Sequence, residues 1–261
     1  MKLLLLLTIT LFASVYGASV ATFSQGRIIN GRDAQPHEAP YIVSLKSGFW
    51  ILKSHTCGGT IISPEWILTA AHCVGGSSID VVAGLHDRSR ESGTQVISVA
   101  KKISHPKYSG GVGPYDIALL KLSKPLKLDD KVQVAKIPEQ DGLREGDADL
   151  YGWGKTSNGI FPSLPNILQT VHTHLINYDE CKAALPSDAP ITDLNICSGS
   201  LDKNISACNG DSGGPLVQKS EDGTEVVGIV SWGYMPCGDE NFPSVYTKVS
   251  SYSDWIRENM K

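Results

Sequence analysis

Residues 210–215 read Gly-Asp-Ser-Gly-Gly-Pro and place one serine, Ser212, among three glycines. Glycine lets the backbone turn, and lets amide N–H groups converge, where a Cβ would obstruct them. A serine in such a loop can act as a nucleophile beside a group of N–H donors. The same letters also make an ordinary surface turn, so the hexapeptide alone leaves both interpretations open.

Two other residues, both much earlier in the chain, could provide the base and the acid that a nucleophilic serine needs. His72 lies next to Cys73, and Asp116 stands before the apolar run 117–120. Taken separately, His72 could equally be a structural histidine, and Asp116 could equally be an acidic residue in a turn. Hydrolysis of an amide needs an activated nucleophile and a base that titrates near ambient pH. The chain order His, Asp, Ser differs from the Ser, acid, His order of the α/β-hydrolase esterases and argues against that class.

The first residues predict export. Lys2 is followed by an apolar run from Leu3 to about Ala13, and small residues precede Gly17. This is the pattern of a signal peptide over residues 1–17, cleaved after Gly17. A membrane anchor is the alternative, but the run is shorter than the roughly 20 residues that span a bilayer. We therefore expect a secreted, extracellular protein without a membrane segment.

Composition and cysteine count agree with an exported globular protein. The chain has 41% hydrophobic and 19% charged residues and a formal net charge of −4, which argues against nucleic acid as a partner. An even number of cysteines in an exported chain favours disulfides over metal ligands or free thiols. The six are Cys57, Cys73, Cys181, Cys197, Cys208 and Cys237, and spacing alone allows 15 pairings.

Short apolar runs between turn residues predict an all-β fold. The expected strands are 41–45, 79–82, 95–99, 117–122, 226–232 and 245–249. A short helix is expected at the end of the chain, where serines that can cap it precede Asp254. The stretch from Pro125 to Asp141 reads as a linker between two β units.

Together these residues resemble the chymotrypsin/trypsin family of serine peptidases. The resemblance runs from Ile28 to the terminal helix. The motifs that carry it are residues 27–31 (Arg-Ile-Ile-Asn-Gly), 69–73 (Thr-Ala-Ala-His-Cys), 116–120 (Asp-Ile-Ala-Leu-Leu), 152–154 (Gly-Trp-Gly), 210–215 and 231–233 (Ser-Trp-Gly).

The resemblance implies two six-stranded antiparallel β-barrels and a C-terminal α-helix, with the active site between the barrels. The expected peptidase domain is residues 28–261, with barrels over about 28–135 and 136–249 and the helix over about 250–261. Ser212 is then the nucleophile, His72 the general base and Asp116 the residue that orients it.

Further roles follow from the same resemblance. The N–H groups of Gly210 and Ser212 form the oxyanion hole. Ser231, Trp232 and Gly233 pair with the extended substrate. The implied disulfides are Cys57–Cys73, Cys181–Cys197 and Cys208–Cys237.

The resemblance also implies a zymogen. Residues 18–27 are the expected propeptide, and cleavage after Arg27 frees the amine of Ile28 to pair with Asp211. A trypsin-like protease is the expected activator, because the pocket described next is unsuited to arginine.

The primary specificity pocket is expected to involve Ser206, Gly233 and Ser244. Ser206 stands six residues before Ser212, where trypsin-like members carry an acid, and a neutral floor gives no counter-charge to a lysine or arginine side chain. Gly233 leaves the mouth open, and Ser244 narrows the deep end. We expect cleavage after large apolar or aromatic residues; elastase-like or collagen-cleaving specificity remains an alternative.

The other expectations concern ligands and partners. No metal and no cofactor is expected; in particular Leu85 follows Gly84 where calcium-binding members carry an acidic ligand. The partners are protein or peptide substrates, the activating protease and protein protease inhibitors, with no nucleic acid and no membrane. We expect a monomeric digestive enzyme, an unused glycosylation sequon at Asn204, and not a catalytically inactive homologue, since none of the three catalytic residues is missing.

Overall fold

The computed structural model describes residues 28–29, 31–49, 52–75, 78–142, 145–157, 163–199, 205–239 and 241–261. The expected signal peptide and propeptide (1–27), including Arg27, and the sequon residue Asn204 lie outside these ranges. No helix in the described part of the chain has the length and apolar character needed to cross a membrane.

Six antiparallel strands close the first barrel in the order β2-β3-β4-β7-β6-β5. Their bounds are β2 Ile42–Phe49, β3 Leu52–Ser63, β4 Trp66–Thr69, β5 Ile79–Ala83, β6 Gln95–Ser104 and β7 Ala118–Leu122. The interior is filled by aliphatic side chains that alternate along the strands, such as Val43 and Leu45 on β2 and Val81 and Ala83 on β5. This alternation is what a period of two residues produces in a strand with one buried face.

The second barrel consists of β9-β10-β13-β12-β11-β8 and is closed by pairing of β8 with β9, while the short β1 adds to β9. The bounds are β1 Arg32–Asp33, β8 Asp147–Gly152, β9 Gln169–Ile176, β10 Asn195–Ser198, β11 Pro215–Ser220, β12 Gly223–Trp232 and β13 Ser244–Lys248. The prediction of two six-stranded antiparallel barrels is therefore confirmed. The expected strands all lie within or overlap observed ones.

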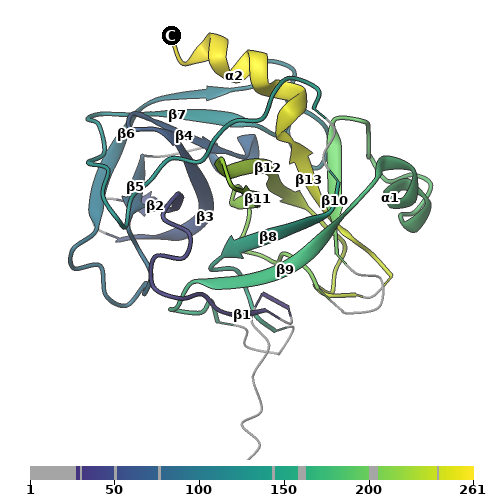
Figure 1. Ribbon diagram of the computed structural model, residues 1–261, viewed down its shortest axis with the longest axis horizontal. Coiled ribbons are helices and arrows are strands. Elements are labelled where there is room, and N and C mark those ends of the chain that lie inside the picture. The colour runs from purple at the N-terminus through teal and green to yellow at the C-terminus, as the bar shows by residue number, and fades with distance from the viewer. Residues whose placement is uncertain are drawn as a thin grey trace, which may run out of the picture.

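The two barrels stand side by side, and the segment that follows β7 leads from the first barrel to β8 of the second (Figure 1). An apolar cluster joins the two barrels; it includes Tyr41 and Trp66 from the first barrel and Trp153 and Ile229 from the second. Burying a side chain of this size stabilises by about 1.5–3 kcal/mol each. The site between the barrels therefore has a rigid base.

The C-terminal segment forms η2 (Val249–Tyr252) and then α2 (Ser253–Asn259). Although α2 follows the second barrel in sequence, it lies over the first (Figure 1), where Trp255 packs on His105 with ring centroids 5.1 Å apart. The helix expected at the end of the chain is confirmed.

A second helix, α1 (Tyr178–Ala184), was not expected from the sequence. Asn177 caps it by accepting the N–H of Glu180 at 2.9 Å. Seven residues make only two turns, which is too short for a helical hydrophobic period to stand out.

Candidate active site

His72 and Asp116 are joined by two hydrogen bonds. The Nδ1 of His72 lies 2.7 Å from Oδ2 of Asp116, and the backbone N–H of His72 donates to Oδ1 at 2.9 Å. The His72 side chain is 30% exposed and that of Asp116 is 2% exposed. An acid that accepts the Nδ1 proton leaves Nε2 as an acceptor, which is the tautomer that a general base requires.

Asp116 is itself held on several sides. Ser231 Oγ donates to Oδ2 at 2.6 Å, and Thr247 Oγ1 donates to the backbone carbonyl of Asp116 at 2.8 Å. Ser231 and Thr247 belong to the second barrel, whereas Asp116 leads into β7 of the first. The acid is thus fixed by contacts across the interface between the barrels.

The residue before Asp116 has an unusual backbone. Tyr115 has φ of +64°, a conformation that bulky residues rarely adopt. Its ring stacks on His105 with centroids 4.9 Å apart, and its N–H donates to the Tyr252 hydroxyl at 3.2 Å. These contacts hold the turn that aims Asp116 at His72.

Ser212 lies in a loop packed tightly against the first barrel. Its carbonyl accepts the N–H of Gly58 at 2.8 Å. A Cβ on Gly213 would stand 2.2 Å from Oγ1 of Thr69 and 3.1 Å from Sγ of Cys73. Since Cys73 is the neighbour of His72, this close approach brings the Ser212 loop beside the His72 segment.

Gly210 has φ of +103°, and its carbonyl is held by a buried histidine that the sequence did not reveal. Nε2 of His55 lies 2.9 Å from the carbonyl oxygen of Gly210, and Nδ1 lies 2.8 Å from Oγ of Ser44. Burial lowers the pKa of His55 to about 4, against the opposing effect of the Gly210 bond. The ring is therefore neutral at pH 7, with Nε2–H donating to Gly210.

Asp211 is fully buried next to Ser212. Oδ1 accepts the N–H of Gly154 at 2.7 Å and Oδ2 accepts that of Cys208 at 2.9 Å. Burial raises the pKa of Asp211 to about 6, and the two backbone donors offset only part of that effect. No positively charged group of the described chain counters this burial.

Ile28 lies inside the second barrel. It is fully buried and packs with apolar residues that include Leu216 and Ala207, and Ile29 forms an isolated bridge with Ser206. Ser206 precedes Asp211 by five residues. The start of the expected peptidase domain is thus already seated near the loop that carries Asp211 and Ser212.

Three disulfides form, and they join the pairs that the resemblance implied. Cys57–Cys73 ties β3 to the turn that carries His72, Cys181–Cys197 ties α1 to β10, and Cys208–Cys237 bridges two segments beside Ser212. Cys57, His72 and Cys73 bring their ligand atoms within 4.8 Å of one another, but sulfurs bonded to each other offer no thiolate to a metal.

A cavity of about 230 Å³ opens beside Ser212. The described residues that line it are Ala207, Cys208, Asn209, Ser212, Val230, Ser231, Trp232, Gly233, Tyr234, Met235 and Cys237. None of these is charged. The sequence had singled out Ser231, Trp232 and Gly233 here, but Tyr234 and Met235 had no signal that marked them as lining residues.

Ser206 and Ser244 are both buried and are not among these lining residues. Each contacts the backbone of Ala207, which does line the cavity. Ser206 Oγ donates to the Ala207 carbonyl at 2.5 Å, and Ser244 Oγ accepts the Ala207 N–H at 3.0 Å. Their role as pocket floor remains a prediction for the chain cleaved after Arg27.

Comparison with known proteins gives the same assignment over nearly the whole chain. Residues 28–256 match the family model described as Trypsin. The chain is 49% identical to "Lectizyme" of Glossina austeni over 249 residues, covering 92% of this chain and 88% of that protein. It is 35% identical to "Trypsin 5G1" of Aedes aegypti, covering 98% of each, and 37% identical to "Trypsin" of Sus scrofa, covering 92% and 98%.

Proposed function

Since the chain belongs to the trypsin family and is a serine endopeptidase, we propose that it is a secreted zymogen whose active form cleaves after large apolar or aromatic residues. The observation that carries the specificity is the cavity beside Ser212, whose described lining residues include no acid.

The proposed catalytic roles are those of the Ser-His-Asp triad, and the contacts between His72 and Asp116 support them. Ser212 Oγ attacks the scissile carbonyl carbon while His72 Nε2 takes the hydroxyl proton. His72 returns that proton to the departing amine, leaving an acyl-enzyme that water hydrolyses by the same steps in reverse. Asp116 holds the tautomer and stabilises the imidazolium through its 2.7 Å contact with Nδ1.

Charge that develops on the carbonyl oxygen is met by the backbone N–H groups of Gly210 and Ser212. Such preorganised donors lower the barrier because they need no reorientation during the reaction. The bond from His55 fixes the peptide unit after Gly210 and keeps this loop in place. Ser231, Trp232 and Gly233 run along the cavity wall, where an extended substrate can pair with them as an added strand.

Activation would supply the charge that Asp211 lacks. Cleavage after Arg27 gives Ile28 a free ammonium group, and Ile28 already lies buried in the second barrel. A buried carboxylate without a counter-ion is unfavourable, as the raised pKa of Asp211 reflects. Pairing of the two groups would fix Asp211 and, through it, the neighbouring Ser212 and Gly210.

The specificity proposal departs from what two of the relatives' names suggest, since both are called trypsins. A lysine or arginine side chain in the cavity would leave its charge without a partner among the described lining residues. At Gly233 a Cβ would meet nothing within 4 Å, so the space beside this residue is open to a bulky group.

The remaining proposals rest on the sequence. Residues 1–17 direct secretion, 18–27 form the propeptide and 28–261 the peptidase domain, which acts as an extracellular monomer. Its substrates are proteins. A trypsin-like protease activates it, since its own pocket is unsuited to Arg27, and protein inhibitors regulate it.

A two-step experiment tests these proposals. The purified full chain is incubated alone or with immobilised trypsin, and is then treated with an organophosphonate whose attachment is mapped by mass spectrometry. We expect labelling at Ser212 only after cleavage at Arg27. Labelling without cleavage would contradict the zymogen, and no labelling after cleavage would indicate a binding protein instead of an enzyme.

The trypsin-freed product is then given peptides that differ only in the residue before the cleaved bond. We expect Phe, Tyr, Leu and Met to be preferred by at least tenfold. Dominant cleavage after Arg or Lys would overturn the specificity while leaving the catalytic assignment intact.

A further inference from the structure

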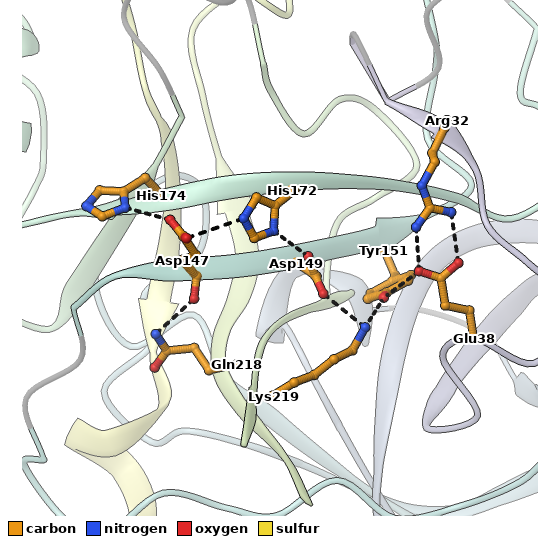
Figure 2. Close-up of polar contacts among 9 residues, drawn as sticks. All are labelled: Arg32, Glu38, Asp147, Asp149, Tyr151, His172, His174, Gln218 and Lys219. Atoms are coloured by element: carbon orange, nitrogen blue, oxygen red, sulfur yellow. Dashed lines mark hydrogen bonds and ion pairs between the residues drawn. The ribbon is translucent and has the colours of Figure 1, made fainter. Parts of the chain in front are cut away.

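Two aspartates and two histidines face each other on the outside of the second barrel (Figure 2). Asp147 and Asp149 lie on β8, and His172 and His174 lie on β9. The register pairs Asp147 directly with His174 and Asp149 with His172. Residues two apart on a strand share a face, and directly opposed residues on antiparallel strands are within contact distance. The fold therefore brings the four side chains together, and none of them belongs to the candidate active site.

His172 lies between the two carboxylates. Its Nδ1 is 2.9 Å from Oδ1 of Asp149, and its Nε2 is 3.4 Å from Oδ2 of Asp147. His174 approaches the other oxygen of Asp147, with Nδ1 at 2.9 Å from Oδ1. Asp147 is thus contacted by both imidazoles.

The two contacts of His172 with carboxylates cannot both be hydrogen bonds donated by a neutral ring. A neutral imidazole carries one N–H, so His172 can donate to one carboxylate only. If Nδ1–H donates to Asp149, the lone pair of Nε2 faces an oxygen of Asp147. A metal ion between the lone pair of Nε2 and Oδ2 of Asp147, which lie 3.4 Å apart, would bond to both.

We propose that Asp147, His172 and His174 bind a divalent transition-metal ion of the Zn²⁺ type, with Asp149 orienting His172. Imidazole nitrogen and carboxylate oxygen are ligands of Zn²⁺ at about 2.0–2.2 Å, and imidazole also suits Cu²⁺ and Ni²⁺. Two ligands at about 2.1 Å in a tetrahedron are about 3.4 Å apart, which matches the distance from His172 Nε2 to Asp147 Oδ2.

Asp149 supplies the second feature of a metal site. A ligating histidine usually donates its other ring N–H to a carboxylate, which fixes the tautomer and the ring orientation. Asp149 stands in that position, and it is anchored on its other side by Lys219, whose Nζ lies 2.9 Å from Oδ2. Lys219 also donates to the Tyr151 hydroxyl, so Asp149 is held in place and Asp147 remains the ligand (Figure 2).

His172 and His174 approach different oxygens of Asp147, so the rings must turn to converge on one ion, and they have room to do so. The side chains of His172 and His174 are 68% and 64% exposed, so rotation about their side-chain bonds meets little packing. The charges near the site are Asp147 and Asp149 from β8, His174 from β9, Lys219 from β11 and the Arg32–Glu38 ion pair, whose Arg32 lines a cavity together with Asp149 and His172. With both histidines neutral, three carboxylates face two cations, and the remaining negative charge attracts a cation.

Proton and metal compete for the same nitrogens, so binding depends on pH. Affinity should therefore be higher at pH 7.5 than at pH 5.5. The ion would link β8 to β9 in the folded chain only, so it should also raise the unfolding temperature.

The test uses the full chain with Ser212→Ala, which prevents self-digestion, titrated with ZnCl₂ in a calorimeter. We expect one ion to bind at pH 7.5 and to bind at least tenfold more weakly at pH 5.5. The H172N/H174N chain should lose this binding, and D149N should weaken it by about 10- to 100-fold. The matched control is H37N, because His37 is exposed and lies on a turn outside β8 and β9.

Unchanged Zn²⁺ affinity in H172N/H174N would overturn the proposal and would point to another ligand set, such as His72. A second measurement needs no variant at these positions. Zn²⁺ should slow modification of His172 and His174 by diethyl pyrocarbonate, mapped by peptide mass spectrometry, and leave His37 reactive. Equal modification with and without Zn²⁺ would also overturn it.

Discussion

His55 Nε2 lies 2.9 Å from the carbonyl oxygen of Gly210, two residues before Ser212 and 155 positions away from His55 in the chain. The contact links β3 of the first barrel to the loop that carries the nucleophile. A residue outside the expected catalytic set therefore governs how firmly the proposed oxyanion hole is held.

The first prediction concerns that link. His55→Ala should reduce kcat by about tenfold to a hundredfold with little change in KM, because the loop is loosened while its N–H donors remain; complete loss of one donor costs about 10²–10³. Steady-state kinetics on the activated chain measure the effect. Ser44→Ala is the milder control, since His55 can still donate to Gly210. Equal activity of His55→Ala and the unaltered enzyme would contradict the assigned role.

Asp116→Asn should lower kcat by about 10⁴-fold. An amide at this position can donate to Nδ1 of His72, which moves the ring proton to Nε2 and removes the acceptor for the Ser212 proton. Ser231→Ala is the matched control: it removes the 2.6 Å bond to Asp116 but leaves the carboxylate, so the loss should stay within about tenfold. Similar losses in the two variants would argue against the tautomer explanation.

Asp211 should make the stability of the uncleaved chain depend on pH. Its folded pKa of about 6 lies above the ordinary 3.8. The folded state therefore holds this proton more tightly, and the related stability is present below about pH 4 and lost as pH rises through about 6. After cleavage the Ile28 ammonium should remove that loss. With Ser212→Ala in both forms, the cleaved chain should gain in unfolding temperature over the uncleaved one between pH 4 and 7.

His55 acts on both forms alike and so cancels in this difference. Its lowered pKa gives stability that is present above about pH 6.5 and is lost as pH falls through about 4. An uncleavable Arg27→Gln chain treated with trypsin is the control. A difference in unfolding temperature that does not change with pH would contradict a role for Asp211 in activation.

Gly213→Ala should destabilise the chain by about 2 kcal/mol or more and abolish activity. The residue has φ of +74°, and a Cβ would stand 2.2 Å from Oγ1 of Thr69 and 2.8 Å from the Gly58 carbonyl oxygen. Gly93→Ala is the control, because Gly93 has a similar φ of +82° but open space around it. Chemical denaturation should show a clearly larger loss for Gly213→Ala; equal losses would mean that the crowding between barrels is unimportant.

Gly233→Val should change specificity without changing stability. Nothing lies within 4 Å of a Cβ at Gly233, so the new side chain projects into the mouth of the cavity without displacing the fold. We expect kcat/KM for Phe and Tyr peptides to fall by about a hundredfold and that for Ala peptides to be kept. Unchanged cleavage after Phe would show that the substrate side chain enters elsewhere.

Much of the fold could be predicted because the decisive signals are local. The apolar runs at 41–45 and 117–122 overlap strands. They could be predicted because a buried strand shows alternating or continuous apolar residues over a short stretch of sequence. The expected runs did not include β1, β3, β4, β8, β9, β10 or β11. In β8 and β9 the outer face carries Asp147, Asp149, His172 and His174, so their sequence pattern is a mixture of polar and apolar residues. The helix α1 was not predicted because it is too short to show a helical hydrophobic period.

The site divides in the same way. Ser212, His72 and Asp116 stand in motifs of five or six adjacent letters, so they could be chosen from sequence. His55 and Ser44 could not, because each is a lone polar residue whose partner lies on another strand or in another barrel. The positive φ of Tyr115 could not be predicted from the sequence either, because the residues that stabilise it, His105 and Tyr252, are brought to it by the fold.

The sequence by itself determined the chain order of His72, Asp116 and Ser212, because these residues stand in contiguous motifs. Through the family resemblance that the motifs carry, it also predicted the two-barrel architecture. Only the tertiary structure decided that Asp211 is buried with no cation beside it in the described part of the chain, that His55 contacts Gly210, and that Ser206 and Ser244 contact the backbone of Ala207. It alone also set two aspartates opposite two histidines. The physical reason is that burial, close approach and cross-strand register arise from segments far apart in the chain, and no local pattern encodes them.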